Sequence, residues 1–229
     1  FLYGLNRIYL LMEKQHNRGQ DGAGLASLKF DMPPGKQYID IAKSNAPMPI
    51  KETLNIAFED AKWALEKHPE YLQDKKLAKD NLRFAGELYL GHLRYGTCGK
   101  NSLENLHPFF RENNWRTRTL AIAGNFNMTH IDGILADLVA KGQFPVKTKD
   151  TAIILEKISH ALDDENGRLY QKFKAEGKTK MQISQAVAKN LDVERVLIEA
   201  SEFWDGGYVM AGIMGHGDSF VVMYPKGTR

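Results

Sequence analysis

The order of apolar and polar residues predicts that the chain begins with a helix and continues into a β-hairpin. The stretch FLYGLNRIYLLMEKQ carries apolar residues at helical spacings, which predicts a helix over residues 3–15. The residues that set this spacing are Leu5, Ile8, Tyr9, Leu11 and Met12. GLASLKF and QYIDIAK alternate as strands do and flank the turn DMPPGK, where Pro33, Pro34 and Gly35 favour a chain reversal. The glycine-rich loop HNRGQDGAG, residues 16–24, joins the helix to the hairpin.

Residues 46–84 differ from their surroundings because they are charged and favour helices. A helical stripe of apolar positions is the predicted buried face, formed by Leu54, Phe58, Ala61 and Leu65. We expect this segment to be a helical insertion packed on the surface of the domain.

Strand patterns return in ELYLGHLRY and RTLAIAGNF, which a loop containing CGKNSLENLHPFF separates. Helical patterns follow over residues 130–141, 150–163, 166–176 and 191–203. GGYVMAGIMG and DSFVVMY then predict a closing β-hairpin around HGD. Strands, then helices, then strands favour a layered α+β domain over a doubly wound sheet.

Composition narrows the class of protein. The 229 residues are 43% hydrophobic, enough for a substantial core. The formal net charge of +3 comes from 31 basic and 28 acidic residues spread along the chain, which does not favour nucleic-acid binding. No apolar run is long enough for a membrane span, and the first residues do not resemble a secretion signal. Cys98 is the single cysteine, which excludes an internal disulfide framework and fits a cytoplasmic protein.

Polar loops at the ends of predicted elements carry the candidate chemistry: HNRGQDGAG, RYGTCGKN, AGNFNM and KTKDTA. They offer Arg18 and Arg94 as cations and Asp21 and Asp150 as anions, with glycines where a ligand can approach the backbone. This set matches an α-amino acid, which needs a guanidinium for its carboxylate and a carboxylate for its ammonium group. Each residue taken singly is more often a turn former or part of a local ion pair.

Five segments together resemble the class II glutamine amidotransferase domain of the amidophosphoribosyltransferase family. They are YGLNRIYLLMEKQHNRGQDGAGLAS, GHLRYGTCGKNSLENLHPF, TLAIAGNFNMT, KTKDTAIILEKI and GGYVMAGIMGHGDSF, in the family's order and over nearly the whole chain. RYGT with RGQD resembles this branch more than the RWATHG-like pattern of glucosamine-6-phosphate synthase.

The resemblance implies a four-layer αββα sandwich of the N-terminal nucleophile hydrolase type, with residues 1–229 as one glutaminase domain. It implies that glutamine is hydrolysed to glutamate and that ammonia passes to phosphoribosyl pyrophosphate on a second domain, which this chain does not include. No cofactor is expected in this chain, and magnesium is expected at the transferase domain. The resemblance further implies a homo-oligomer, and the composition predicts a cytoplasmic protein that binds neither nucleic acid nor membranes.

The resemblance also assigns roles to single residues. Arg94 matches the arginine that binds the glutamine carboxylate, and Asp150 matches the aspartate that receives the ammonium group. Gly124 matches the glycine whose backbone N–H points into the oxyanion hole. Arg18 matches the loop arginine beside the amino group of the nucleophile.

Two further residues join the predicted glutamine site by their place in the motifs. Thr97 belongs to the RYGT motif. His107 stands where the glucosamine-6-phosphate synthase branch has a substrate-contacting histidine, although a capping or core histidine explains it equally well.

The chain departs from the family at the nucleophile, which is a cysteine at the mature N-terminus that attacks while its own α-amine acts as the base. We expect that cysteine and the first strand upstream of Phe1, so this chain alone is predicted to be inactive and to have an unpaired sheet edge. Cys98 is not expected to replace it, because an internal cysteine has no free α-amine. A small buried or half-exposed thiol is the simpler interpretation.

Two more departures concern the oxyanion hole and the domain boundary. Ala123 stands where the family has an asparagine that completes the oxyanion hole, and we expect Asn125 or Asn127 to supply the missing donor. Tyr224 replaces an aspartate in the turn that leads to the transferase domain. The alternatives are another class II amidotransferase or a non-catalytic relative that binds an amino acid or a partner.

Overall fold

The computed structural model describes residues 1–95 and 102–223, and for Arg18 it describes the backbone alone. The chain divides into two compact units, Phe1–Pro108 (unit 1) and Phe109–Arg229 (unit 2). Each unit combines an antiparallel sheet with helices. The predicted α+β class is therefore confirmed.

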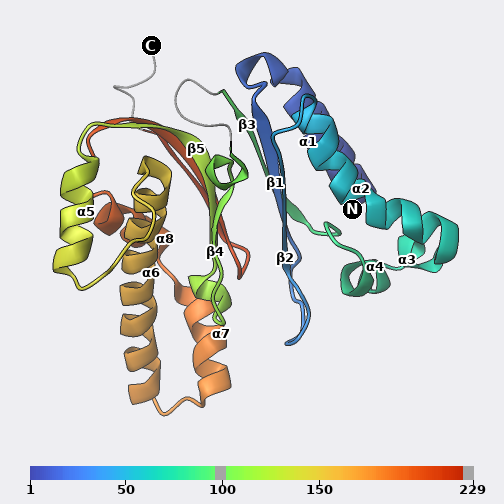
Figure 1. Cartoon of the computed structure of the whole chain (residues 1–229). Coiled ribbons are helices and arrows are strands. Elements are labelled where there is room, and N and C mark those ends of the chain that lie inside the picture. The colour runs from blue at the N-terminus through green and yellow to red at the C-terminus, as the bar shows by residue number, and fades with distance from the viewer. Residues whose placement is uncertain (96–101, 224–229) are drawn as a thin grey trace. The chain divides into compact units, whose positions relative to one another are not determined.

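Unit 1 is a three-stranded sheet with helices on one face. Its strands are β1 (Gly22–Leu28), β2 (Ile39–Ser44) and β3 (Leu88–Arg94), in the order β2-β1-β3. Helix α1 (Leu2–Lys14) and helix α2 (Pro49–Lys67) cover the sheet face from which Ala23 and Leu25 point (Figure 1). The predicted first helix and hairpin are both confirmed. In the turn, Gly35 has φ +83°, a conformation that glycine adopts readily.

The segment 46–84 is helical, as predicted, and forms α2, α3 (Glu70–Gln73) and α4 (Lys75–Asn81). Its predicted buried stripe is only half right. Leu54 and Ala61 are buried, but Leu65 is 60% exposed because the buried face continues through Ala57 and Ala64 instead. That the segment is an insertion stays a prediction.

Unit 2 is a four-stranded antiparallel sheet in the order β4-β5-β6-β7. Its strands are β4 (Phe109–Arg111), β5 (Leu120–Met128), β6 (Gly206–Met214) and β7 (Ser219–Met223). Its helices are α5 (Ile131–Ala140), α6 (Asp150–Ala175), α7 (Lys180–Asn190) and α8 (Val193–Ala200). Figure 1 shows α5, α6 and α8 on one side of this sheet, where β5 and β6 share a hydrophobic core with them.

The predictions for unit 2 were wrong at three elements. Residues 150–175 form one continuous helix rather than two, α7 was not predicted, and the three-residue strand β4 was missed. In α6 the buried Asn166 donates to the carbonyls of Leu162 and Thr117 and accepts from the Thr117 hydroxyl. These bonds satisfy a polar side chain that would otherwise favour a break in the helix.

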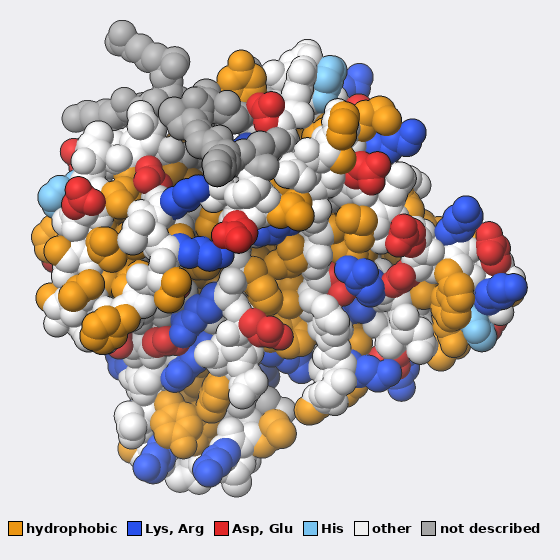
Figure 2. Space-filling model, in the orientation of Figure 1, with side chains coloured by type: hydrophobic (Ala, Val, Ile, Leu, Met, Phe, Trp, Pro, Cys, Tyr) orange, Lys and Arg blue, Asp and Glu red, His pale blue; other side chains and the backbone are white. Residues whose placement is uncertain are grey.

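Within the described residues, no helix is both long and apolar enough to cross a membrane. On the face shown in Figure 2, acidic and basic side chains are interspersed, in keeping with their nearly balanced numbers. The four-layer order of sheets and helices stays a prediction.

Candidate functional site

The loop HNRGQDGAG lies against the end of β3 within unit 1. A short 3₁₀ turn, η1 (His16–Arg18), leads into it. The backbone N–H of Asp21 donates to the Arg94 carbonyl at 3.1 Å. Gly19 packs directly against the backbone of Arg94, and a Cβ on Gly19 would lie 2.7 Å from the Arg94 carbonyl carbon. The loop therefore fixes the backbone of Arg94, and a glycine is needed at the contact.

Arg94 and its neighbour His92 lie on the sheet face opposite the one that α1 and α2 cover. In the ladder Gly22 pairs with Arg94 and Gly24 pairs with His92, while Ala23 and Leu25 point toward the helices. The chain then returns across this second face. Its Asn105 carbonyl accepts a hydrogen bond from Arg94 Nη1 at 2.9 Å.

His107 is held within the same part of unit 1. It is buried, and its ring stacks on His92 with 4.2 Å between centroids. Burial, with the nearby His92, Lys43 and Arg94, lowers the pKa of His107 from 6.5 to about 2. His107 is therefore a neutral, packed imidazole, and its contact with a substrate stays a prediction.

Gly124 and Asn125 are neighbours on β5 in unit 2, opposite Met210 and Val209 of β6. A Cβ at Gly124 would lie 2.4 Å from the Val209 carbonyl oxygen, so β6 packing alone already requires a glycine. Alternation along β5 places Asn125 on the side away from the helix-covered core. Ala123 and Asn127 share that side, and both asparagines are exposed.

Asp150 is the first residue of α6 and is half-buried. A carboxylate in this position is favoured by the positive end of the helix dipole. The apolar run that follows it, through Ile153 and Ile154, anchors the helix in the core of unit 2. Asp150 is thus on a rigid element, as a binding residue needs to be.

The predicted site residues are divided between the two units. Arg18 and His107 join Arg94 in unit 1, whereas Gly124, Asn125 and Asp150 belong to unit 2. Thr97, Cys98 and Tyr224 lie outside the described residues. Sequence reasoning missed Asn105, whose contribution is a backbone carbonyl, and His92, which alternation along β3 places on the same face as Arg94.

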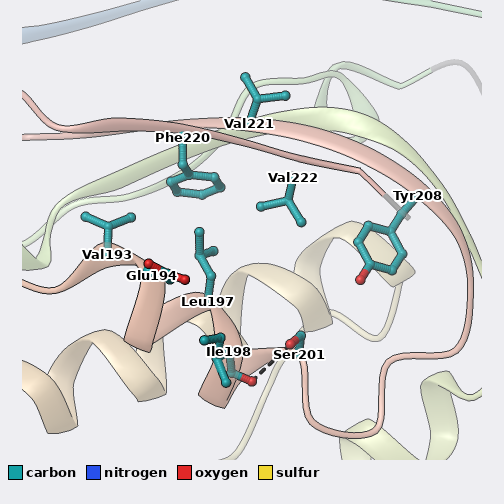
Figure 3. A pocket seen from close by; sticks show the side chains of 9 residues that line it. All are labelled: Val193, Glu194, Leu197, Ile198, Ser201, Tyr208, Phe220, Val221 and Val222. Atoms are coloured by element: carbon teal, nitrogen blue, oxygen red, sulfur yellow. Dashed lines mark hydrogen bonds between the residues drawn. The ribbon is translucent and has the colours of Figure 1, made fainter. Parts of the chain in front are cut away.

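Grooves lie among the described residues of both units. One of about 490 Å³ in unit 1 is bordered by Gly19 and Gln20 of the glycine-rich loop and by the start of α2. Another of about 400 Å³ in unit 2 lies between α8 and the β6–β7 hairpin, with Leu197 facing Phe220 and Val222 (Figure 3). The second groove contains none of the predicted residues. In the described part of the chain, no three His, Cys, Asp or Glu side chains gather as a metal site.

No family model matches the chain. It is 25% identical over 151 residues to amidophosphoribosyltransferase 2, chloroplastic, of Arabidopsis thaliana. The matched region covers 66% of this chain and 21% of that protein. It is also 24% identical over 165 residues to an amidophosphoribosyltransferase of Methanothermobacter thermautotrophicus. This matched region covers 72% of this chain and 28% of that protein. The chain thus spans about a quarter of the length of these curated relatives.

Solved structures match over nearly the whole chain. The structure of the allosteric regulatory enzyme of purine biosynthesis has a TM-score of 0.55 at 18% identity. The match covers 96% of this chain and 35% of the chain in that structure. Glutamine phosphoribosylpyrophosphate amidotransferase from B. subtilis, complexed with ADP and GMP, has a TM-score of 0.52 at 20% identity, covering 96% and 34%. The chain therefore shares the fold of about a third of each of these two solved structures. In sequence it is similar to amidophosphoribosyltransferases, the family that its motifs resemble.

Proposed function

We propose that this chain is the glutamine-hydrolysing part of an amidotransferase that delivers ammonia to phosphoribosyl pyrophosphate. The observation that carries the proposal is the arginine at the end of β3. Its backbone is fixed by the glycine-rich loop and its guanidinium is held by a backbone carbonyl, in a chain similar to amidophosphoribosyltransferases.

The binding groups suit the two charged ends of glutamine. A guanidinium presents a planar set of donors that pairs with a carboxylate, which is the role proposed for Arg94. The half-buried carboxylate of Asp150 would pair with the ammonium group. Arg18, Thr97 and His107 complete the proposed binding residues.

Hydrolysis needs a nucleophile, and the proposal assigns it to an N-terminal cysteine outside these 229 residues. Its thiol attacks the side-chain amide carbon, ammonia leaves, and water then releases glutamate from the thioester. The Gly124 N–H, with Asn125, would stabilise the oxyanion of the tetrahedral intermediate. The second domain with its magnesium, the homo-oligomer and the cytoplasmic location belong to the same proposal.

The test measures ammonia release from glutamine by the full-length protein. Arg94→Ala and Asp150→Ala should each raise the KM for glutamine at least about tenfold, because each removes one charged contact. Arg7→Ala, on the exposed side of α1, and Asp132→Ala, in the first turn of α5, are matched controls that should leave the KM unchanged. Wild-type kinetics in both test variants would refute the substrate assignment.

Two alternatives give different results in the same assay. Ala123, buried on β5 in place of the family's asparagine, favours a non-catalytic relative. Such a protein would bind glutamine in calorimetry without releasing ammonia. Another class II amidotransferase would release ammonia but would transfer none to phosphoribosyl pyrophosphate, so no phosphoribosylamine would form.

A further inference from the structure

The guanidinium of Arg94 is held from a segment that follows it in sequence. Arg94 Nη1 donates to the backbone carbonyl of Asn105 at 2.9 Å, and Arg94 is half-buried. A backbone carbonyl has little freedom when its own residue is fixed. This carbonyl therefore restrains the position of the guanidinium.

A closed turn fixes Asn105 itself. The residue ends the 3₁₀ turn η2 (Leu103–Asn105), and its backbone N–H donates to the Ser102 carbonyl at 3.0 Å. Its side-chain Nδ2 donates to Ser102 Oγ at 2.8 Å. Ser102 and Asn105 are thus joined twice, once through the backbone and once through their side chains.

The next residue anchors this turn to the sheet. Leu106 is buried and packs directly against Gly22. A Cβ added to Gly22 would lie only 2.4 Å from Leu106 Cδ2. Gly22 pairs with Arg94 in the β1–β3 ladder. Because Leu106 packs on the residue that pairs with Arg94, it holds the neighbouring Asn105 carbonyl close to Arg94.

We propose that Asn105, together with Ser102, is a positioning residue that orients the Arg94 guanidinium for a carboxylate. This inference rests on the proposed function, because the carboxylate is that of glutamine. An arginine side chain has many rotamers, and one that is held in place before the ligand arrives loses less freedom on binding. Planar, two-pronged pairing with a carboxylate also depends on the orientation of the guanidinium.

The test is the glutamine dependence of ammonia release by the full-length protein. Asn105→Ala and Ser102→Ala should each raise the KM for glutamine about tenfold and change kcat by less than about twofold, since only ground-state positioning is lost. Ser102→Thr keeps the hydroxyl and should restore the wild-type KM. Asn81→Ala is the matched control, because it also removes an amide that donates one local hydrogen bond in unit 1, to the Leu77 carbonyl.

A double-mutant cycle shows whether the effect acts through Arg94. In the Arg94→Ala background, Asn105→Ala should raise the KM no further. An equal further rise in that background would overturn the positioning role, as would a loss of kcat with an unchanged KM. Should Asn105→Ala fail to fold, Ser102→Ala carries the same prediction through a side chain at the edge of the turn.

Calorimetry with glutamine separates this inference from the proposed function. If the wild-type protein binds glutamine and Asn105→Ala binds it about tenfold more weakly, both stand. If the wild-type and Asn105→Ala proteins bind it equally, the positioning role fails and the proposed function stands. If the wild-type protein does not bind glutamine, both the proposed function and the positioning role are refuted.

Discussion

The backbone of Gly24 lies directly against the carbonyl group of His107. A Cβ built on Gly24 would be 1.8 Å from that oxygen and 3.1 Å from Pro108 Cδ. Gly24 has no left-handed backbone angle to explain it, so the close approach of the 106–108 segment is the reason for the glycine. The contact joins the glycine-rich loop to the segment that also holds Arg94.

Gly24→Ala should destabilise unit 1 by about 2–3 kcal/mol or more, because a methyl group and a backbone oxygen cannot share this space. The measurement is the free energy of unfolding in urea. Gly167→Ala is the control, since a Cβ at that position in α6 would meet no atom within 4 Å. It should be neutral or stabilising by about 0.5–1 kcal/mol. Equal stability of wild type and Gly24→Ala would contradict the close packing of Gly24 against the His107 carbonyl.

Sequence periodicity predicted the elements whose environment is simple. The β1–β2 hairpin and α1 follow from alternation, helical spacing and the PPG turn, and the structure confirms them. Within α1, however, Leu11 is 63% exposed although its spacing suggested burial. A single apolar residue is weak evidence for the direction of a helix face.

Other features of the fold and of the site depend on contacts between residues far apart in sequence, which a local pattern does not reveal. The pattern predicted separate helices over residues 150–163 and 166–176, but α6 is continuous there. Within it the side chain of Asn166 bonds to both the hydroxyl and the carbonyl of Thr117, far away in sequence. The bond from Arg94 to the Asn105 carbonyl is also invisible in the sequence, because every residue carries a carbonyl. For α7 a local signal did exist, since Thr179 and Gln182 have the spacing of a capping box.

That capping box gives a second stability prediction. The Gln182 side chain accepts from the Thr179 N–H at 2.9 Å, and the Thr179 hydroxyl accepts from the Gln182 N–H at 3.4 Å. Thr179→Ala should reduce the free energy of unfolding by about 1 kcal/mol, and Thr179→Ser should largely retain it. Urea denaturation of the three proteins compares them, and equal midpoints for wild type and Thr179→Ala would rule out a stabilising cap.

His107 predicts how stability depends on pH. Its pKa is lowered from 6.5 to about 2, chiefly by burial and further by His92, Lys43 and Arg94. Above pH 6.5 both the folded and the unfolded chain hold a neutral imidazole. Between pH 6.5 and about 2 only the unfolded chain binds the proton, so folding becomes less favourable as the pH falls, by about 1.4 kcal/mol per pH unit.

The measurement compares wild type with His107→Gln at pH 7.5 and pH 5. The wild type should lose about 2 kcal/mol more stability than the variant over this interval, because only the wild type has to keep this imidazole neutral in the folded state. Urea unfolding at the two pH values provides the four free energies. A pH dependence that is the same in both proteins would mean that His107 accepts a proton in the folded state.

The last prediction concerns the oxyanion donor that Ala123 lacks. Asn125 and Asn127 project from the same side of β5 as Ala123, and Asn125 is two residues from it along the strand. In the full-length protein Asn125→Ala should lower kcat for ammonia release about 10²-fold with little change in the KM, since an oxyanion donor acts mainly on the transition state. Asn127→Ala is the matched variant, and a comparable loss there with no loss at Asn125 would move the role to Asn127. Unchanged rates in both variants would leave the Gly124 N–H as the donor and exclude either asparagine from the chemistry.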